Sequence, residues 1–341
     1  MDLYTKVESR AVSPLRAFEQ RATAVSIAVT LALGMAMSSS SAFAMDPPAW
    51  AYPLNPPDYK PAPDDGKLQR VPNSIVSFSI PQTRNLFFTP DWHPGDHAPM
   101  PTVVALGRKP DVYACGFCHR ATGPGGPENA NLTGLPFDYI VAQMRDYRSG
   151  ARMSALPDRA PQRLMIKGSK NLTDEEINEA AAYFSALKPK QSIRVVETET
   201  IPQPVVANWT WVDHKTGKRE PLAKRIIEVP EHLEDFELRD ARTTFIAYVP
   251  PGSLKRGEAL VKGTVANSTI ACATCHGEAL RGMTVAPPIA GRSASYAMRQ
   301  LYEFKTGVRI GSNAALMKPV VENLNSDDML AIVAYLASRT P

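Results

Sequence analysis

Apolar and aromatic positions follow a helical period in two matching pairs of segments. In the segments 139–147 and 296–304, aromatic and glutamine side chains recur every four residues. A second pair opens with a polar capping sequence, Thr173 with Glu176 and Asn325 with Asp328, and continues with apolar residues at helical spacing. These patterns predict four helices, two in each half of a mainly α protein.

Other parts of the chain have a different pattern. Residues 194–196, 208–212 and 226–229 have strand-like composition, and DHKTGKRE at 213–220 is a candidate turn, so we expect a small β-hairpin there. Residues 45–100 hold 12 of the 31 prolines, which predicts an extended or loop-rich segment.

The predicted helices belong to an internal repeat. CGFCH and CATCH open two units in which the same motifs follow in the same order, and the matches from these motifs to Arg152 and Arg309 keep an offset of 157 residues. Two homologous domains are the simplest explanation. We therefore divide the chain into a leader (1–44), a proline-rich extension (45–100), domain 1 (101–190), an inter-domain segment (191–252) and domain 2 (253–341).

C-x-x-C-H is the attachment signature of c-type haem. The two thiols add to the two vinyl groups of one porphyrin, and the adjacent histidine can then coordinate the iron. A redox-active C-x-x-C would require a βαβ context, and a shared zinc site would require 153 intervening residues to fold around one ion. We expect two haem c groups, bound through Cys115 and Cys118 with His119, and through Cys272 and Cys275 with His276.

A sixth iron ligand decides whether a haem transfers electrons or binds small molecules. Met165 and Met317 stand at equivalent places, seven residues before Leu172 and Leu324, and we expect them to be these ligands. Met153 is the alternative in domain 1. In domain 2, Met283 follows His276 by only seven residues, too few to reach the opposite face.

With these motifs the chain resembles the class I cytochromes c, and specifically their tandem two-domain diheme members. The resemblance covers residues 112–188 and 253–341, and includes a turn from Pro287 to Gly291. It implies that the Pro287 carbonyl orients His276. Domain 1 departs from this pattern, since Ala130 stands at the equivalent position and Pro127 comes three residues earlier, so the resemblance does not carry this hydrogen bond over to His119.

The family's N-terminal helix also differs between the two repeats. In domain 2, Ser253 can cap such a helix, and Tyr335 is its expected contact. In domain 1 the segment PTVVALGRKPDVY is broken by Pro110, so either this haem is more exposed or the extension covers it. The spacing of the repeat also suggests four residues that contact the haem edges: Tyr139, Arg152, Tyr296 and Arg309. Of these, we expect the two arginines to bind the haem propionates.

The remaining histidines and tryptophans suggest no second site. We interpret His93 and His97 as solvated loop residues, because the proline and glycine between them oppose a helix that presents both on one face. The same interpretation applies to His214 and His232, and we expect Trp209 and Trp211 to pack. The inter-domain segment is either a spacer between the haems or a docking surface.

The N-terminal sequence and the charge bear on location and partners. An apolar run from Ala22 to Met37 followed by Ala42-Phe43-Ala44 predicts an export signal cleaved after Ala44, and the run is too short for a stable membrane anchor. We expect a periplasmic protein. The mature chain has 34 basic and 31 acidic residues, with the excess of basic residues in the two repeat domains. This charge does not indicate nucleic-acid binding, but favours an acidic patch on a redox partner.

The leading functional hypothesis is an electron carrier that is not an enzyme, with a donor and an acceptor that are redox proteins such as a dehydrogenase or a terminal oxidase. A diheme peroxidase would need one open iron, against which the repeated methionine argues. A cysteine-ligated haem enzyme would need a fifth cysteine, and the chain has four. A cytochrome subunit of a larger dehydrogenase complex is the remaining alternative.

Overall fold

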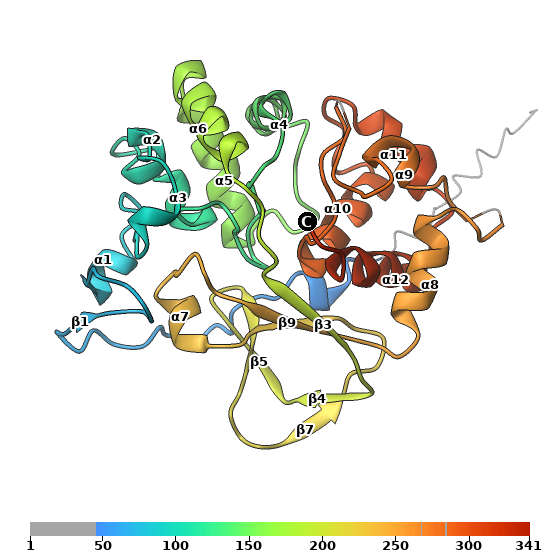
Figure 1. Ribbon diagram of the computed structural model, residues 1–341, viewed down its shortest axis with the longest axis horizontal. Coiled ribbons are helices and arrows are strands. Elements are labelled where there is room, and N and C mark those ends of the chain that lie inside the picture. The colour runs from blue at the N-terminus through green and yellow to red at the C-terminus, as the bar shows by residue number, and fades with distance from the viewer. Residues whose placement is uncertain (1–45, 267, 284) are drawn as a thin grey trace, which may run out of the picture. The chain divides into compact units, whose positions relative to one another are not determined.

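The computed structural model describes residues 46–266, 268–283 and 285–341, and the predicted leader lies outside the described residues. Two groups of helices, α2–α6 and α8–α12, are separated along the chain by a β-rich segment (Figure 1). The prediction of a mainly α fold with two helical domains is confirmed. Among the described residues, no helix combines the length and the apolar character needed to cross a membrane.

Domain 1 contains two long helices that meet at the centre of its core. The capping box predicted at Thr173 is present, with the Thr173 side chain accepting from the Glu176 amide. Gly150 ends the other long helix with a φ of 81°, a left-handed conformation that glycine adopts without strain. Ile140, Val141 and Ile177 lie between these helices. The helices are α2 (Thr102–Ala105), α3 (Cys115–His119), α4 (Phe137–Ser149), α5 (Ala160–Asn171) and α6 (Asp174–Ala186).

Domain 2 repeats this arrangement and adds a longer first helix. That helix begins at Ser253, but Gly252 is its N-cap and no side chain caps it, so the predicted capping role of Ser253 is wrong. It packs closely on the last helix, because Gly257 brings the two backbones together beside Ala331 and Tyr335. The helices are α8 (Ser253–Val261), α9 (Ala273–His276), α10 (Ala294–Lys305), α11 (Ala314–Val321) and α12 (Ser326–Ala337).

The inter-domain segment contains more β-structure than the single hairpin predicted. A three-stranded sheet has the order β3-β9-β8, in which β3 and β9 are parallel, and two antiparallel pairs join β4 to β7 and β5 to β6. The predicted strand at 208–212 is partly wrong: Asn208 and Trp209 form the turn between β5 and β6 with φ values of 50° and 59°. The elements are β3 (Ile193–Glu197), β4 (Thr200–Pro202), β5 (Pro204–Ala207), β6 (Thr210–Asp213), β7 (Arg219–Pro221), β8 (Ile227–Pro230), α7 (Leu233–Glu237) and β9 (Phe245–Val249).

This segment shares one apolar core with domain 2. Ile227 and Val249 are buried in the same cluster as Met298 and Val333 of the domain. The junction also contains a buried carboxylate, since Glu228 accepts hydrogen bonds at the start of α10. The inter-domain segment is therefore packed as part of domain 2 and is not a free linker.

The proline-rich extension is built from short elements and packs against the other parts. Trp50 and Tyr52 join the core of domain 2, while Thr89 lies against Gly116 of domain 1. The interpretation of His93 and His97 as solvated is wrong: His93 is 8% exposed and lies 3.3 Å from Asp240, and the largely buried His97 ring lies 3.2 Å from Asp91. The elements are η1 (Ala49–Ala51), β1 (Leu68–Gln69), β2 (Phe78–Ser79), α1 (Ile80–Thr83) and η2 (Pro94–Asp96).

Candidate haem sites

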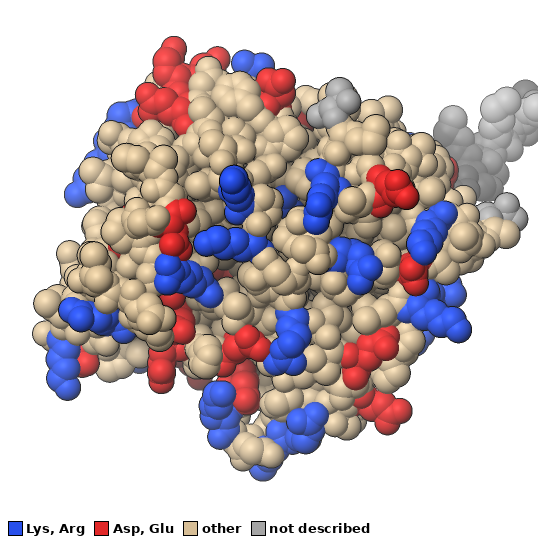
Figure 2. All heavy atoms as spheres, in the orientation of Figure 1, with Lys and Arg blue, Asp and Glu red and all other residues tan. Residues whose placement is uncertain are grey.

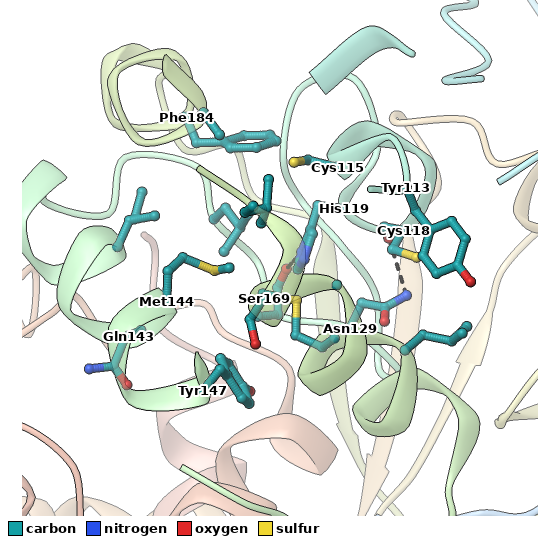
Figure 3. A pocket seen from close by; sticks show the side chains of 18 of the residues that line it. Tyr113, Cys115, Cys118, His119, Asn129, Gln143, Met144, Tyr147, Ser169 and Phe184 are labelled. Carbon is teal, nitrogen blue, oxygen red and sulfur yellow. Dashed lines mark hydrogen bonds between the residues drawn. The ribbon is translucent and has the colours of Figure 1, made fainter. Parts of the chain in front are cut away.

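In domain 1, the C-x-x-C-H sequence forms the short helix α3 and presents its cysteines and histidine to one pocket. Arg120 ends this helix with a φ of 68°. Cys115, Cys118 and His119 all line the pocket, and Figure 3 shows the three side chains at its wall. The Phe184 ring contacts the His119 ring at 6.3 Å between centroids. The attachment residues therefore meet in space as the motif requires.

The orientation of His119 suits an iron ligand. Its Nδ1 lies 2.8 Å from the Ala130 carbonyl oxygen, which accepts the ring proton and leaves Nε2 as the free nitrogen. Burial lowers the pKa of His119 to about 4, so the ring is neutral near pH 7. Domain 1 therefore keeps this hydrogen bond although Ala130 stands where domain 2 has Pro287, because a backbone carbonyl can accept a hydrogen bond whatever side chain its residue carries.

Domain 2 has the equivalent arrangement. The Nδ1 atom of His276 lies 2.7 Å from the Pro287 carbonyl oxygen, 11 residues along the chain, as in domain 1. Burial also lowers the pKa of His276. The attachment helix is more accessible than in domain 1, since Thr274 and Cys275 are exposed while Gly116 and Phe117 are buried. The two sites share one ligand geometry but have different surroundings.

Burial raises the pKa of the Cys115 thiol to about 12 and that of Cys272 to about 11. A disulfide-exchange C-x-x-C requires a thiolate, and thus a lowered pKa. The environment of these cysteines is therefore wrong for that chemistry. It suits thiols that are held in an apolar pocket as attachment points.

One of the two predicted methionine ligands lines the domain 1 pocket. Met165 on α5 lines the domain 1 pocket together with His119, whereas Met153 is not among the lining residues. Met144 on α4 also lines this pocket and is visible in Figure 3. The repeat does not point to Met144, because its counterpart in domain 2 is Leu301. In domain 2, Met317 on α11 packs partly buried against the core.

The four predicted haem-edge residues meet at the junction of the two domains. Arg152 donates to the Tyr296 hydroxyl at 2.8 Å, and Arg309 donates to the Tyr139 hydroxyl at 3.0 Å. Both guanidinium groups also bond the amide oxygens of the repeat glutamines, Gln143 and Gln300. Each domain thus supplies an arginine to the other domain's tyrosine and glutamine.

The charges at this junction fit a group that carries carboxylates. Arg152 is 4% exposed and lines the pocket with His119, yet its hydrogen-bond partners are uncharged amide and phenol oxygens. Arg292 is also buried and donates to the carbonyls of Asn131 and Thr133, and its Nε atom has no hydrogen-bond partner among the described residues. Burial lowers the pKa of Arg292 to about 10. Acidic groups at the haem edge would complement these cations, so the residues present fit haem.

Comparison with known proteins agrees with this geometry. The cytochrome c family model matches residues 106–188 and 254–340. A thiosulfate dehydrogenase electron acceptor of Stutzerimonas stutzeri is 39% identical over 235 residues, covering 68% of this chain and 82% of that protein. Cytochrome c4 of Azotobacter vinelandii is 26% identical over 231 residues, covering 65% and 82%.

A solved structure, the thiosulfate dehydrogenase TsdBA of Marichromatium purpuratum, is 25% identical with a TM-score of 0.47, and the match covers 70% of this chain and 39% of that one. The chain belongs to the cytochrome c family, with two cytochrome c domains in tandem. It is a diheme electron carrier similar to cytochrome c4, with one haem c at each pair of cysteines.

Proposed function

We propose that this chain is the electron acceptor of a thiosulfate dehydrogenase, that it is exported to the periplasm, and that it passes single electrons on to a further redox protein. The observation that carries the proposal is the 39% identity, over 235 residues, to a protein described as such an acceptor. A second relative with the same description, from Thiomonas intermedia, is 25% identical over 235 residues. The apolar N-terminal run and its A-x-A sequence support export.

Haem iron, when bound, changes between the ferric and ferrous states and supplies the one-electron chemistry. The chain's own residues hold and insulate it. Cys115, Cys118, Cys272 and Cys275 attach the porphyrins, and His119 and His276 offer Nε2 because their Nδ1 protons are engaged by carbonyls. Met165 and Met317 are the proposed sulfur ligands. The apolar walls formed by residues such as Ile140 and Ile177 exclude water.

The basic residues have two proposed roles. Arg152 and Arg309, with Tyr139 and Tyr296, pair with haem carboxylates at the domain junction, where their present partners are uncharged. On the surface, Lys and Arg side chains are spread over the face shown in Figure 2, while acidic side chains gather at the outer end of α6, where Asp174 begins the helix. We propose that an acidic partner docks by weak, salt-dependent contacts.

The ligand assignment is tested by substituting each candidate methionine in the holoprotein. Met165→Ala should abolish the methionine-to-iron charge-transfer band of one ferric haem, and Met153→Ala should leave both bands unchanged, since Met153 is absent from the pocket lining. Met144→Ala distinguishes the other pocket methionine. Loss of the band in Met144→Ala with its retention in Met165→Ala would transfer the role to Met144.

The partner assignment is tested by mixing the oxidised holoprotein with a thiosulfate dehydrogenase and thiosulfate in the absence of oxygen. We expect both haems to be reduced, and the rate to fall as salt is added. Thiosulfate alone and dehydrogenase alone are the controls. If the dehydrogenase turns over with an artificial acceptor but leaves these haems oxidised, the proposed partner is wrong.

A further inference from the structure

An arginine of the inter-domain segment lies directly on the haem attachment helix of domain 1. The Arg239 guanidinium carbon is 3.7 Å from the centroid of the Phe117 ring, and Nη1 donates to the Phe117 carbonyl at 3.2 Å. Phe117 immediately precedes the haem-attaching Cys118. A positive charge is thus held one residue from the attachment cysteine.

Arg239 also contacts the proline-rich extension. Its Nε donates to the Thr83 carbonyl of the extension at 3.0 Å, and its backbone has a φ of 64°. The preceding residue, Leu238, accepts a hydrogen bond from the Trp92 indole at 2.8 Å. Figure 1 shows α7, just before this turn, on the same side of the molecule as α1 of the extension and α3 of domain 1. The side chain is therefore fixed by both inserted segments of the chain.

The local charge at this attachment helix is positive. Arg120, next to His119, lies 3.3 Å from Glu128 and forms a buried ion pair with it. The Phe236 ring lies 5.6 Å from the Arg120 guanidinium carbon, so α7 also contacts this second arginine. Arg239 adds one positive charge to this neutral pair. The Phe117 ring and two backbone carbonyls offset that charge only in part. The cluster of Arg120, Glu128 and Arg239 carries one net positive charge.

The described residues of domain 2 show no such arrangement. The repeat places Thr274 where domain 1 has Phe117, and Gly277 where it has Arg120. In the described part of the chain, no hydrogen bond or ion pair from residues 191–252 reaches α9. The exposure of Thr274 and Cys275 also leaves this side to water, which screens charge. The surroundings of the domain 1 haem are therefore more positive than those of the domain 2 haem.

We propose that Arg239 is a tuning residue of the electron carrier, which raises the reduction potential of the domain 1 haem above that of the domain 2 haem. A ferric haem carries one more positive charge than a ferrous haem, so a nearby fixed cation disfavours the oxidised state. At partial reduction the electron resides in domain 1. The proposal rests on haem attachment at Cys118, and on neither the methionine ligands nor the identity of the partner.

The test is a spectroelectrochemical titration of the full-length holoprotein, resolved into two midpoints. Arg239→Gln should lower the higher midpoint by about 59 mV, which is a tenfold change in the oxidised-to-reduced ratio for one electron, and leave the lower midpoint in place. Arg239→Lys keeps the charge and should retain most of the potential. Arg219→Gln, in exposed β7, is the matched control and should change neither midpoint.

A second variant tests the same charge cluster with the opposite sign. Glu128→Gln removes the single negative charge and should raise the higher midpoint, and it decides the question if Arg239→Gln yields no holoprotein. The proposal is overturned if Arg239→Gln leaves both midpoints unchanged, moves both equally or moves the lower one, or if Glu128→Gln leaves the higher midpoint unchanged. An electrode titration needs no partner protein, so failure here is distinct from failure with thiosulfate dehydrogenase.

Discussion

Arg152 and Arg309 occupy equivalent places in the two halves of the repeat and pair with each other in an antiparallel β-bridge. Their side chains cross the junction, each bonding residues of the opposite domain. The two domains are therefore joined by a pair of symmetric contacts made from the same sequence motif. Each arginine, which the sequence predicts to contact the haem of its own domain, therefore also contributes to holding the two domains together.

The shared contacts at this junction predict that substitutions of the two arginines have non-additive effects on stability. Arg152→Gln and Arg309→Gln should each lower the free energy of unfolding by about 1.5–3 kcal/mol, because each removes charged hydrogen bonds between buried groups. The double variant should lose less unfolding free energy than the two single variants lose together, since both arginines bond Gln143 and Gln300. Denaturant unfolding of the holoproteins measures this, with exposed Arg163→Gln as the control. Strict additivity would contradict the shared network.

The close contact of α8 with α12 predicts that Gly257 does not tolerate a side chain. A Cβ atom at this position would lie 2.0 Å from the Ala331 carbonyl oxygen, so Gly257→Ala should force the helices apart and cost about 1–3 kcal/mol. Gly95→Ala is the matched control, because its Cβ would meet nothing within 4 Å, so its effect on stability should stay within about 0.5 kcal/mol. Thermal unfolding would refute the packing argument if the two variants behaved alike.

The buried carboxylate of Glu228 joins the inter-domain segment to domain 2 by hydrogen bonds, and we predict that these bonds stabilise the folded protein. It accepts from the Ser293 hydroxyl at 2.7 Å and from the amides of Ala294 and Ser295 at 3.1 and 2.8 Å. Glu228→Gln replaces one accepting oxygen by an NH₂ group that faces these donors, and should destabilise the protein by about 1–3 kcal/mol. Glu220→Gln, on partly exposed β7, is the control. An unchanged unfolding midpoint for Glu228→Gln would remove this role.

The His97–Asp91 pair predicts a pH-dependent contribution to stability. Its hydrogen bond with Asp91 raises the pKa of His97 above the ordinary value of 6.5, so the folded protein binds this proton more tightly than the unfolded chain. The stabilisation is fully present below about pH 6.5 and is lost as the pH rises through the raised pKa.

Thermal unfolding between pH 5.5 and 8.5 measures this contribution. The melting temperature of His97→Gln should lie below that of the unaltered protein at the acidic end, and the gap should narrow as the pH rises. Exposed His232→Gln is the control, and its difference should not show this narrowing. A gap for His97→Gln that stays constant across the range would assign the effect to packing alone.

Sequence and structure agree at the two capping boxes and at the attachment motifs. The helices near Thr173 and Asn325 begin at the predicted capping boxes, because a cap is formed by residues three positions apart. The attachment residues Cys115, Cys118 and His119 are likewise adjacent in the chain. Their common orientation follows from a single turn of helix.

The predictions that failed concerned the N-cap at Ser253, the exposure of two histidines and the strand at 208–212. We expected His93 and His97 to be solvated because proline and glycine lie between them. Instead, the buried His93 ring lies beside Asp240, 147 residues later, and the largely buried His97 ring lies beside Asp91. The strand at 208–212 was misplaced because the turn at Asn208 and Trp209 uses positive φ at residues other than glycine. No local signal marks either feature.

The sequence by itself determined the two domains, their four attachment cysteines and the histidines predicted to bind the irons, because a repeat and a covalent motif are properties of the chain order. Only the tertiary structure decided what surrounds each haem site. It placed Arg239 on Phe117, across 122 residues, and crossed Arg152 and Arg309 between the domains. Such contacts depend on how separate segments pack to bury apolar surface, and the energy of that packing is distributed over many residues rather than written in any one motif.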